Sequence, residues 1–243
     1  MKKIVTVVFA LGLISFASAQ KKNDSKNKTV VETAGDHLLL QISSDHWKGT
    51  PDSISSHMKG LSRGFNMYVM LNKPFKANPK WSVAFGVGVS TSSMYFKKMS
   101  INLKAAGIVL PFDTLDYAPF HYKKYKLATS FLEIPVELRY AFNPETPRKS
   151  WKIAIGAKVG TMLNAHTKGK TLQNVTGSTV NGGIIDKTTK KIFFNTTRFA
   201  ATARVGYGNF SLFGAYQVTS FFKDGSGGAD IRPYQVGICL SGL

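Results

Sequence analysis

The chain has 243 residues, of which 43% are hydrophobic, and its 32 lysine and arginine residues against 13 acidic residues give a formal net charge of +19. This length and composition predict one main domain with a buried core. The single cysteine, Cys239, excludes an intramolecular disulfide. No nucleic-acid motif or basic helical face accompanies the charge, so we expect an anionic lipid or polysaccharide as partner and no nucleic acid.

The first 19 residues have the features of a secretory signal peptide. Lys2 and Lys3 precede the apolar run IVTVVFALGLI, and the small-residue stretch ASA ends at Ala19. We therefore expect Sec-type export and cleavage before Gln20. Residues 20–36 are polar and poor in aromatic residues, which predicts a flexible periplasmic leader. Residues 37–243 are then expected to form the folded domain.

Eight later segments show the twofold alternation of β-strands, and no helical period of useful length lies between them. In WSVAFGVGVSTSSMYF, which begins at Trp81, bulky apolar residues share one face, whereas serine, alanine and glycine share the other. Such a strand suits a lipid on one side and a narrow interior on the other. The eight segments are 37–45, 64–71, 81–96, 125–142, 151–164, 192–207, 210–222 and 232–242.

The connections between these segments alternate in length. Those at 72–80, 143–150 and 208–209 are short and contain glycine, proline or asparagine, whereas the connections at 97–124 and 165–191 are long. Short turns on one rim and long loops on the other are typical of outer-membrane barrels. We therefore predict an all-β fold, an eight-stranded antiparallel up-and-down transmembrane β-barrel that is integral to the outer membrane.

Two groups of residues follow from the face on which they fall. Aromatic residues beside the short turns share the apolar face, which predicts a lipid-interface girdle. The opposite face carries charges, and an eight-stranded barrel is just wide enough for side chains, so we expect an ion-paired plug, with a polar channel as the alternative. The girdle comprises Trp81, Tyr140, Phe142, Trp151, Tyr207 and Phe210; the interior charges are Glu133, Glu137, Arg139, Lys152, Lys158, Arg198 and Arg204.

The long loops are basic. This charge fits contact with lipopolysaccharide phosphates or with an acidic envelope or secretion-system protein, although a merely solvated surface is the plain alternative. The basic loop residues are Lys97, Lys98, Lys104, Lys123, Lys124, Lys168, Lys170, Lys187, Lys190 and Lys191.

No motif for catalysis, cofactor or metal binding is evident. The loop histidines His46, His57, His121 and His166 match no metal-ligand spacing. Cys239 falls on the inward face and predicts a buried, inert thiol. Without a nucleophile motif or a phosphate-binding glycine loop, we expect neither an enzyme nor a cofactor.

Three stretches carry a family resemblance: FLEIPVELRYAF at 131–142, WKIAIGAKVGTML at 151–163 and DIRPYQVGICLSGL at 230–243. With them the chain resembles the PorT-like outer-membrane β-barrel family of Bacteroidota. The resemblance implies an outer-membrane location and, in some members, a role in type IX protein secretion. The expected function is a structural or interaction role at the cell envelope, as a possible accessory of that secretion. The alternatives are a small-solute channel and a soluble lipocalin-like barrel that binds a ligand.

Overall fold

The computed structural model describes residues 37–226 and 230–242. The signal peptide predicted at 1–19 and the leader predicted at 20–36 lie outside the described residues. The strands are β1 Leu38–Lys48, β2 Ser62–Pro74, β3 Trp81–Phe96, β4 Met99–Ile101, β5 Phe112–Thr114, β6 Phe120–Ala141, β7 Trp151–Asn174, β8 Thr179–Thr189, β9 Thr197–Tyr207, β10 Phe210–Gln217 and β11 Arg232–Ser241. Helix α2 spans Asp52–Ser55, and the 3₁₀ turn η1 spans Pro147–Lys149.

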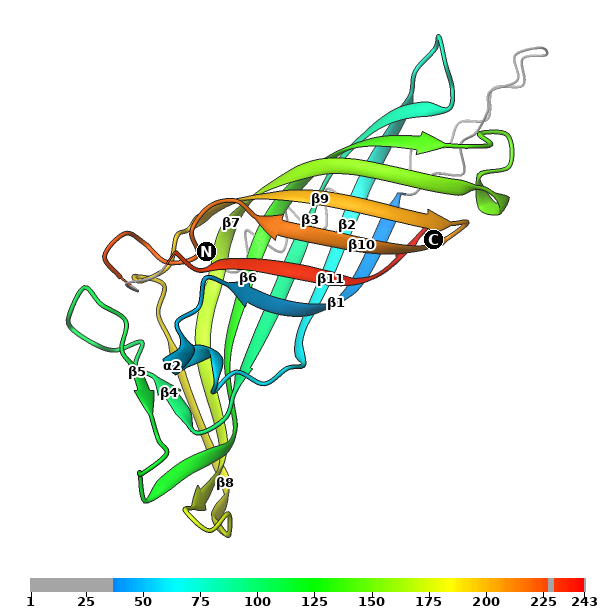
Figure 1. Ribbon diagram of the computed structural model, residues 1–243. Coiled ribbons are helices and arrows are strands. Elements are labelled where there is room, and N and C mark those ends of the chain that lie inside the picture. Colours follow the sequence, from blue (N-terminus) through cyan, green and yellow to red (C-terminus); the bar gives the residue numbers. More distant parts are fainter. Residues whose placement is uncertain (1–36, 227–229, 243) are drawn as a thin grey trace, which may run out of the picture. The chain divides into compact units, whose positions relative to one another are not determined.

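Eight strands form a closed antiparallel ring (Figure 1). Their order is β6-β3-β2-β1-β11-β10-β9-β7, and pairing of β6 with β7 closes the ring. Ring closure removes the sheet edges, which a bilayer does not tolerate. The predicted all-β, eight-stranded, up-and-down barrel is therefore confirmed. Neither helical segment in the described part of the chain has the length or hydropathy to cross a membrane.

Several predicted strand boundaries are wrong. The predicted strands at 192–207 and 210–222 are shorter than expected, because β9 begins at Thr197 and β10 ends at Gln217. The predicted loop at 165–191 is instead a hairpin, made of the end of β7 and of β8, which adds a ninth strand beside the ring. Strand β6 also begins earlier, at Phe120, so β6, β7 and β8 continue beyond the ends of β10 and β11 (Figure 1).

The two faces of the barrel wall differ as the alternation predicts. Outward apolar side chains such as Val87 and Ile155 are 50% and 59% exposed, whereas inward residues such as Asn66 and Glu133 are fully buried. A lipocalin-type barrel has the opposite arrangement, with its apolar face around an internal ligand. The alternative of a soluble lipocalin-like barrel is therefore wrong.

A β-bulge changes the outward face partway along β7. Ser130 of β6 pairs with Asn164, but its neighbour Phe131 pairs with Met162, so Leu163 is an extra residue. Because side chains alternate with period two, one extra residue moves every later side chain of β7 to the other face. The bulge turns the even-numbered residues of the extracellular part of β7 outward.

The lipid-facing surface gives a direct test. We expect Ile155→Arg, near the middle of the apolar belt, to lower the free energy of unfolding by about 2–4 kcal/mol, because arginine is poorly solvated there. The measurement is urea unfolding in lipid vesicles. Ile108→Arg is the matched control, since Ile108 is exposed in the β3–β6 connection. Equal effects of the two substitutions would show that Ile155 does not contact lipid.

Candidate functional site

An ion-pair cluster occupies the middle of the barrel. Glu133 of β6 forms an ion pair with Arg198 of β9, and its Oε2 lies 3.2 Å from Lys158 Nζ of β7. Tyr68 of β2 donates to the same oxygen at 2.5 Å, and Lys158 donates to the Tyr68 hydroxyl at 3.2 Å. These four side chains come from four strands and are all buried, so they join opposite sides of the wall.

A hydrogen-bonded chain leads from this cluster toward the extracellular mouth. Arg198 donates to Ser90 Oγ at 2.9 Å, and Ser90 donates to Asn66 Oδ1 at 2.6 Å. Asn66 donates to Gln235 at 3.5 Å, and Gln235 donates to both carboxylate oxygens of Asp45 at 3.1 Å. The interior is thus crosslinked by polar side chains rather than lined by open polar walls.

A second cluster lies nearer the periplasmic rim. Arg139 Nε donates to Glu137 Oε2 at 2.8 Å, and Arg204 donates to the same oxygen at 3.1 Å. Arg204 also donates to Ser211 Oγ at 3.4 Å. Six of the seven predicted interior charges are therefore buried in these two clusters, whereas Lys152 is half-buried beside the rim.

The small residues of the inward face make room for these clusters. A Cβ added to Gly88 would lie 2.5 Å from the Tyr68 ring, and one added to Gly160 would lie 2.8 Å from Glu133 Cγ. Both distances are shorter than van der Waals contact. The glycines of β3 and β7 thus leave space that long polar side chains of neighbouring strands fill.

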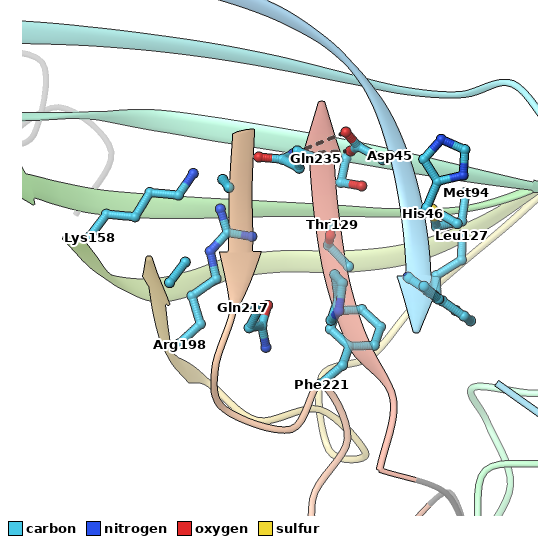
Figure 2. Close-up of a pocket in the computed structure, with 15 residues that line it drawn as sticks. Asp45, His46, Met94, Leu127, Thr129, Lys158, Arg198, Gln217, Phe221 and Gln235 are labelled. Atoms are coloured by element: carbon cyan, nitrogen blue, oxygen red, sulfur yellow. Dashed lines mark hydrogen bonds between the residues drawn. The ribbon is translucent and has the colours of Figure 1, made fainter. Parts of the chain in front are cut away.

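The space left in the interior is small (Figure 2). The cavity between Asp45, Lys158, Arg198, Gln217 and Gln235 leaves about 20 Å³ for the centres of water molecules. That volume holds about one water. Phe221 and Trp47 line its extracellular end, so the cavity lies beneath an apolar layer.

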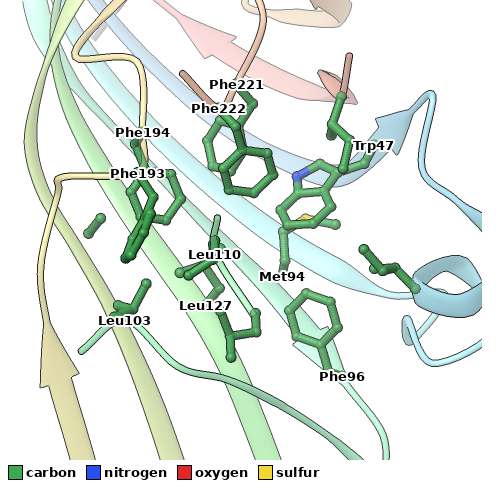
Figure 3. Close-up of a cluster of buried hydrophobic side chains, with 14 of the residues drawn as sticks. Trp47, Met94, Phe96, Leu103, Leu110, Leu127, Phe193, Phe194, Phe221 and Phe222 are labelled. Carbon is green, nitrogen blue, oxygen red and sulfur yellow. The ribbon is translucent and has the colours of Figure 1, made fainter. Parts of the chain in front are cut away.

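That layer is an apolar cluster that we call the loop cap (Figure 3). It gathers side chains from the strand ends and from all four extracellular connections. The ring of Phe222 lies 5.3 Å from Phe194, 6.0 Å from Trp47 and 6.0 Å from Phe112, measured between centroids. The cap comprises Trp47, Ile54, Met94, Phe96, Met99, Ile101, Leu103, Leu110, Tyr125, Leu127, Phe131, Met162, Ala165, Phe193, Phe194, Phe221, Phe222 and Ile231.

Backbone contacts also join the connections of the cap. Phe194 forms a β-bridge with Phe222, Met58 forms one with Phe96, and the amide of Leu110 donates to Ser226 at 2.6 Å. The sequence prediction missed this cap. Phe193 and Phe194 are adjacent and both buried, as are Phe221 and Phe222, which breaks the strand alternation and explains why both predicted strands end early.

Five outward lysines lie together on the extracellular part of the wall, on a surface that we call the lysine face. Three of them form a cross-strand row, with Lys126 of β6 opposite Lys168 of β7 and Lys168 opposite Lys187 of β8. Lys124 lies opposite Lys170 in the next row. Because directly opposite residues of antiparallel strands point to the same side, these ammonium groups share one face.

The surroundings of the lysine face reflect its charge. Burial, followed by the charges of Lys187, Lys126 and Lys168, holds the pKa of His166 below its usual value. Burial and the charge of Lys170 likewise lower the pKa of Lys126. Asp186, next to Lys187, pairs with Gly169 and therefore lies on the other face.

The remaining predicted basic residues lie outside the lysine face. Lys191 donates to the Met162 carbonyl at 3.3 Å, and Lys98 adopts a positive φ of 49° after β3. Lys126 belongs to the lysine face although the sequence analysis did not include it. Its even position in β6, in step with outward Leu132, is the signal that identifies it. Lys97, Lys98, Lys104, Lys123, Lys190 and Lys191 are exposed or half-buried.

The predicted girdle residues lie at the short turns. Trp81 is opposite Tyr140, with ring centroids 4.9 Å apart, and Trp151 is opposite Tyr207 at 5.8 Å. Phe142 packs on Tyr140 at 5.1 Å, and Phe210 pairs with Tyr207. These outward aromatic side chains mark one boundary of the apolar belt.

The histidines and the cysteine do not gather into a site. His46 stacks on Tyr234, and His57 Nε2 lies 2.9 Å from Asp116. Cys239 is fully buried. Among the described residues, no group of three or more histidine, cysteine or acidic side chains could hold a metal ion.

A closed ring with an apolar exterior and a polar, ion-paired interior defines an integral outer-membrane β-barrel protein. The family model described as "Outer membrane protein beta-barrel domain" matches residues 18–225, and the chain belongs to that family. The protein is therefore integral to the outer membrane.

Two solved structures are similar to the chain. The first is Ail, the attachment invasion locus protein of Yersinia pestis, with 14% identity, 84% of this chain and 95% of Ail covered, and a TM-score of 0.32. The second is Neisserial surface protein A, with 13% identity, 84% and 97% covered, and a TM-score of 0.33. No curated protein sequence matches the chain.

Proposed function

We propose that the barrel is an interaction protein of the cell envelope, whose folded extracellular part binds an anionic partner, and that it conducts no small solutes. The loop cap carries this proposal. Its aromatic side chains pack above an interior that two ion-pair clusters already fill, so a solute would have to displace both layers. A capped barrel with a structured basic surface is better suited to binding than to transport.

Single-channel recording in a planar bilayer tests this function. We expect no discrete conductance steps from the folded protein, because the interior holds only isolated waters. The positive control is a general porin that is refolded in the same detergent. Regular conductance steps from a fully folded, heat-modifiable sample would overturn the proposal and favour the small-solute channel.

The finer role that we propose is that of an accessory of type IX protein secretion, as the PorT-like resemblance implies. Deletion of the gene, followed by quantitative proteomics of the culture supernatant, tests this role. We expect the loss of many secreted proteins together, with recovery on complementation. An unchanged set of secreted proteins would rule out the secretion role and leave a surface-binding barrel.

A further inference from the structure

We infer that the lysine face binds phosphate groups of lipopolysaccharide in the outer leaflet that surrounds the barrel. This inference rests on the proposed interaction function and assigns that function a site and a partner chemistry. The site consists of Lys126, Lys168 and Lys187 in one cross-strand row, with Lys124 and Lys170 in the row beyond.

The first argument is the arrangement of the charges. Like charges directly opposite each other in a sheet are destabilising, yet this sheet aligns three ammonium groups across three strands. The nearest carboxylate of the same strand, Asp186, lies on the other face and accepts a hydrogen bond from Tyr122 at 3.3 Å. An anion with several negative charges, placed over the row, would offset this repulsion.

The second argument is the height of the lysine face above the membrane. Lys126 lies six residues beyond Leu132, an exposed apolar residue of the lipid-facing belt on the same strand. At 3.3 Å per residue and a tilt of about 40°, this spacing is roughly 15 Å along the barrel axis. Lysine side chains can bend several ångströms toward the membrane. The ammonium groups therefore reach the level of the phosphorylated headgroup sugars.

The third argument distinguishes a lipid from a soluble polyanion. The bulge at Leu163 turns Lys168 and Lys170 outward, onto a continuation of the lipid-facing wall rather than onto the top of the loop cap. The Lys126 ammonium lies 5.7 Å from the ring centroid of Tyr95, and it donates to Ser93 at 3.1 Å. An outward tyrosine beside a lysine is typical of a membrane interface. A ligand on this wall would approach from the side, where lipopolysaccharide lies.

Binding of labelled lipopolysaccharide to the folded barrel in uncharged detergent tests the inference. We expect the triple variant Lys126→Gln, Lys168→Gln, Lys187→Gln to bind at least tenfold more weakly than the unmodified protein. The control variant Lys97→Gln, Lys104→Gln, Lys223→Gln removes three exposed charges elsewhere on the extracellular side, and we expect its affinity to change less than twofold. Binding of chemically dephosphorylated lipopolysaccharide should be weakened as much as binding to the lysine-face variant.

Equal losses in the two triple variants, or equal binding of phosphorylated and dephosphorylated lipopolysaccharide, would overturn the inference. Inorganic phosphate or a soluble sulfated polysaccharide that bound as tightly would also overturn it, since the lipid would not be the preferred source of the anion. Single-channel recording of the same variants separates this result from the proposed function. Silent channels with unchanged lipopolysaccharide binding would reject the lysine-face site alone, whereas open channels would reject the interaction function.

Discussion

Glu133→Gln is expected to lower the free energy of unfolding by about 3–5 kcal/mol, the largest effect of any single substitution in the interior. The substitution leaves Lys158 and Arg198 buried without the carboxylate that both contact, and it weakens the 2.5 Å hydrogen bond from Tyr68. The measurement is urea unfolding of the refolded barrel in micelles, followed by the heat-modifiable shift in gel mobility.

Two further variants make this result specific. Glu145→Gln, on the exposed β6–β7 turn, removes the same charge and should change stability by less than 1 kcal/mol. Combining Glu133→Gln with Lys158→Met and Arg198→Met should restore part of the loss, because the uncompensated cations are then absent. A loss below 1 kcal/mol for Glu133→Gln alone would show that the cluster does not crosslink the wall.

Phe222→Ala is expected to destabilise the loop cap by about 3–5 kcal/mol while leaving the barrel folded, because it removes a fully buried ring that packs on other aromatic rings of the cap. Native-state hydrogen exchange measures this effect. The amides of Leu110, Asn195 and Phe221, which donate within the cap, should lose protection. Barrel amides such as that of Val136 should keep theirs.

The control for the cap is Tyr117→Ala, which removes an aromatic ring that is 101% exposed and should alter no amide's protection. Equal loss of protection in cap and barrel after Phe222→Ala would mean that the two unfold together. Conductance that appeared in the Phe222→Ala protein alone would identify the cap as the layer that keeps the barrel closed.

The period of two was enough to predict the barrel, since each strand's inward and outward residues follow from it. It also separated the interior charges such as Glu133 and Arg198 from outward residues such as Trp151. The partners of these charges are polar residues such as Asn66 and Tyr68 of β2, which lie on the same inward face. Applying the alternation to β2 would have identified them.

The loop cap and the lysine face were not predicted, for two different reasons. The cap depends on contacts between connections far apart in the sequence, and adjacent aromatic residues such as Phe193 and Phe194 carry no periodic signal. The lysine face depends on the bulge at Leu163, because an unbroken alternation would have pointed Lys168 inward. A single extra residue in a strand has no sequence signature of its own here.

The pairing of β1 with β11 constrains how this protein can be made. Leu39 lies opposite Ser241, so the ring closes only through residues near the two ends of the folded domain. Contacts of such long sequence separation form slowly, since the whole intervening chain must be ordered first. Until β11 arrives, β1 and β10 would each present unpaired amides and carbonyls, which hydrocarbon does not solvate. The domain cannot therefore insert strand by strand as it is synthesised, and it must reach the membrane as a finished polypeptide that closes in one step.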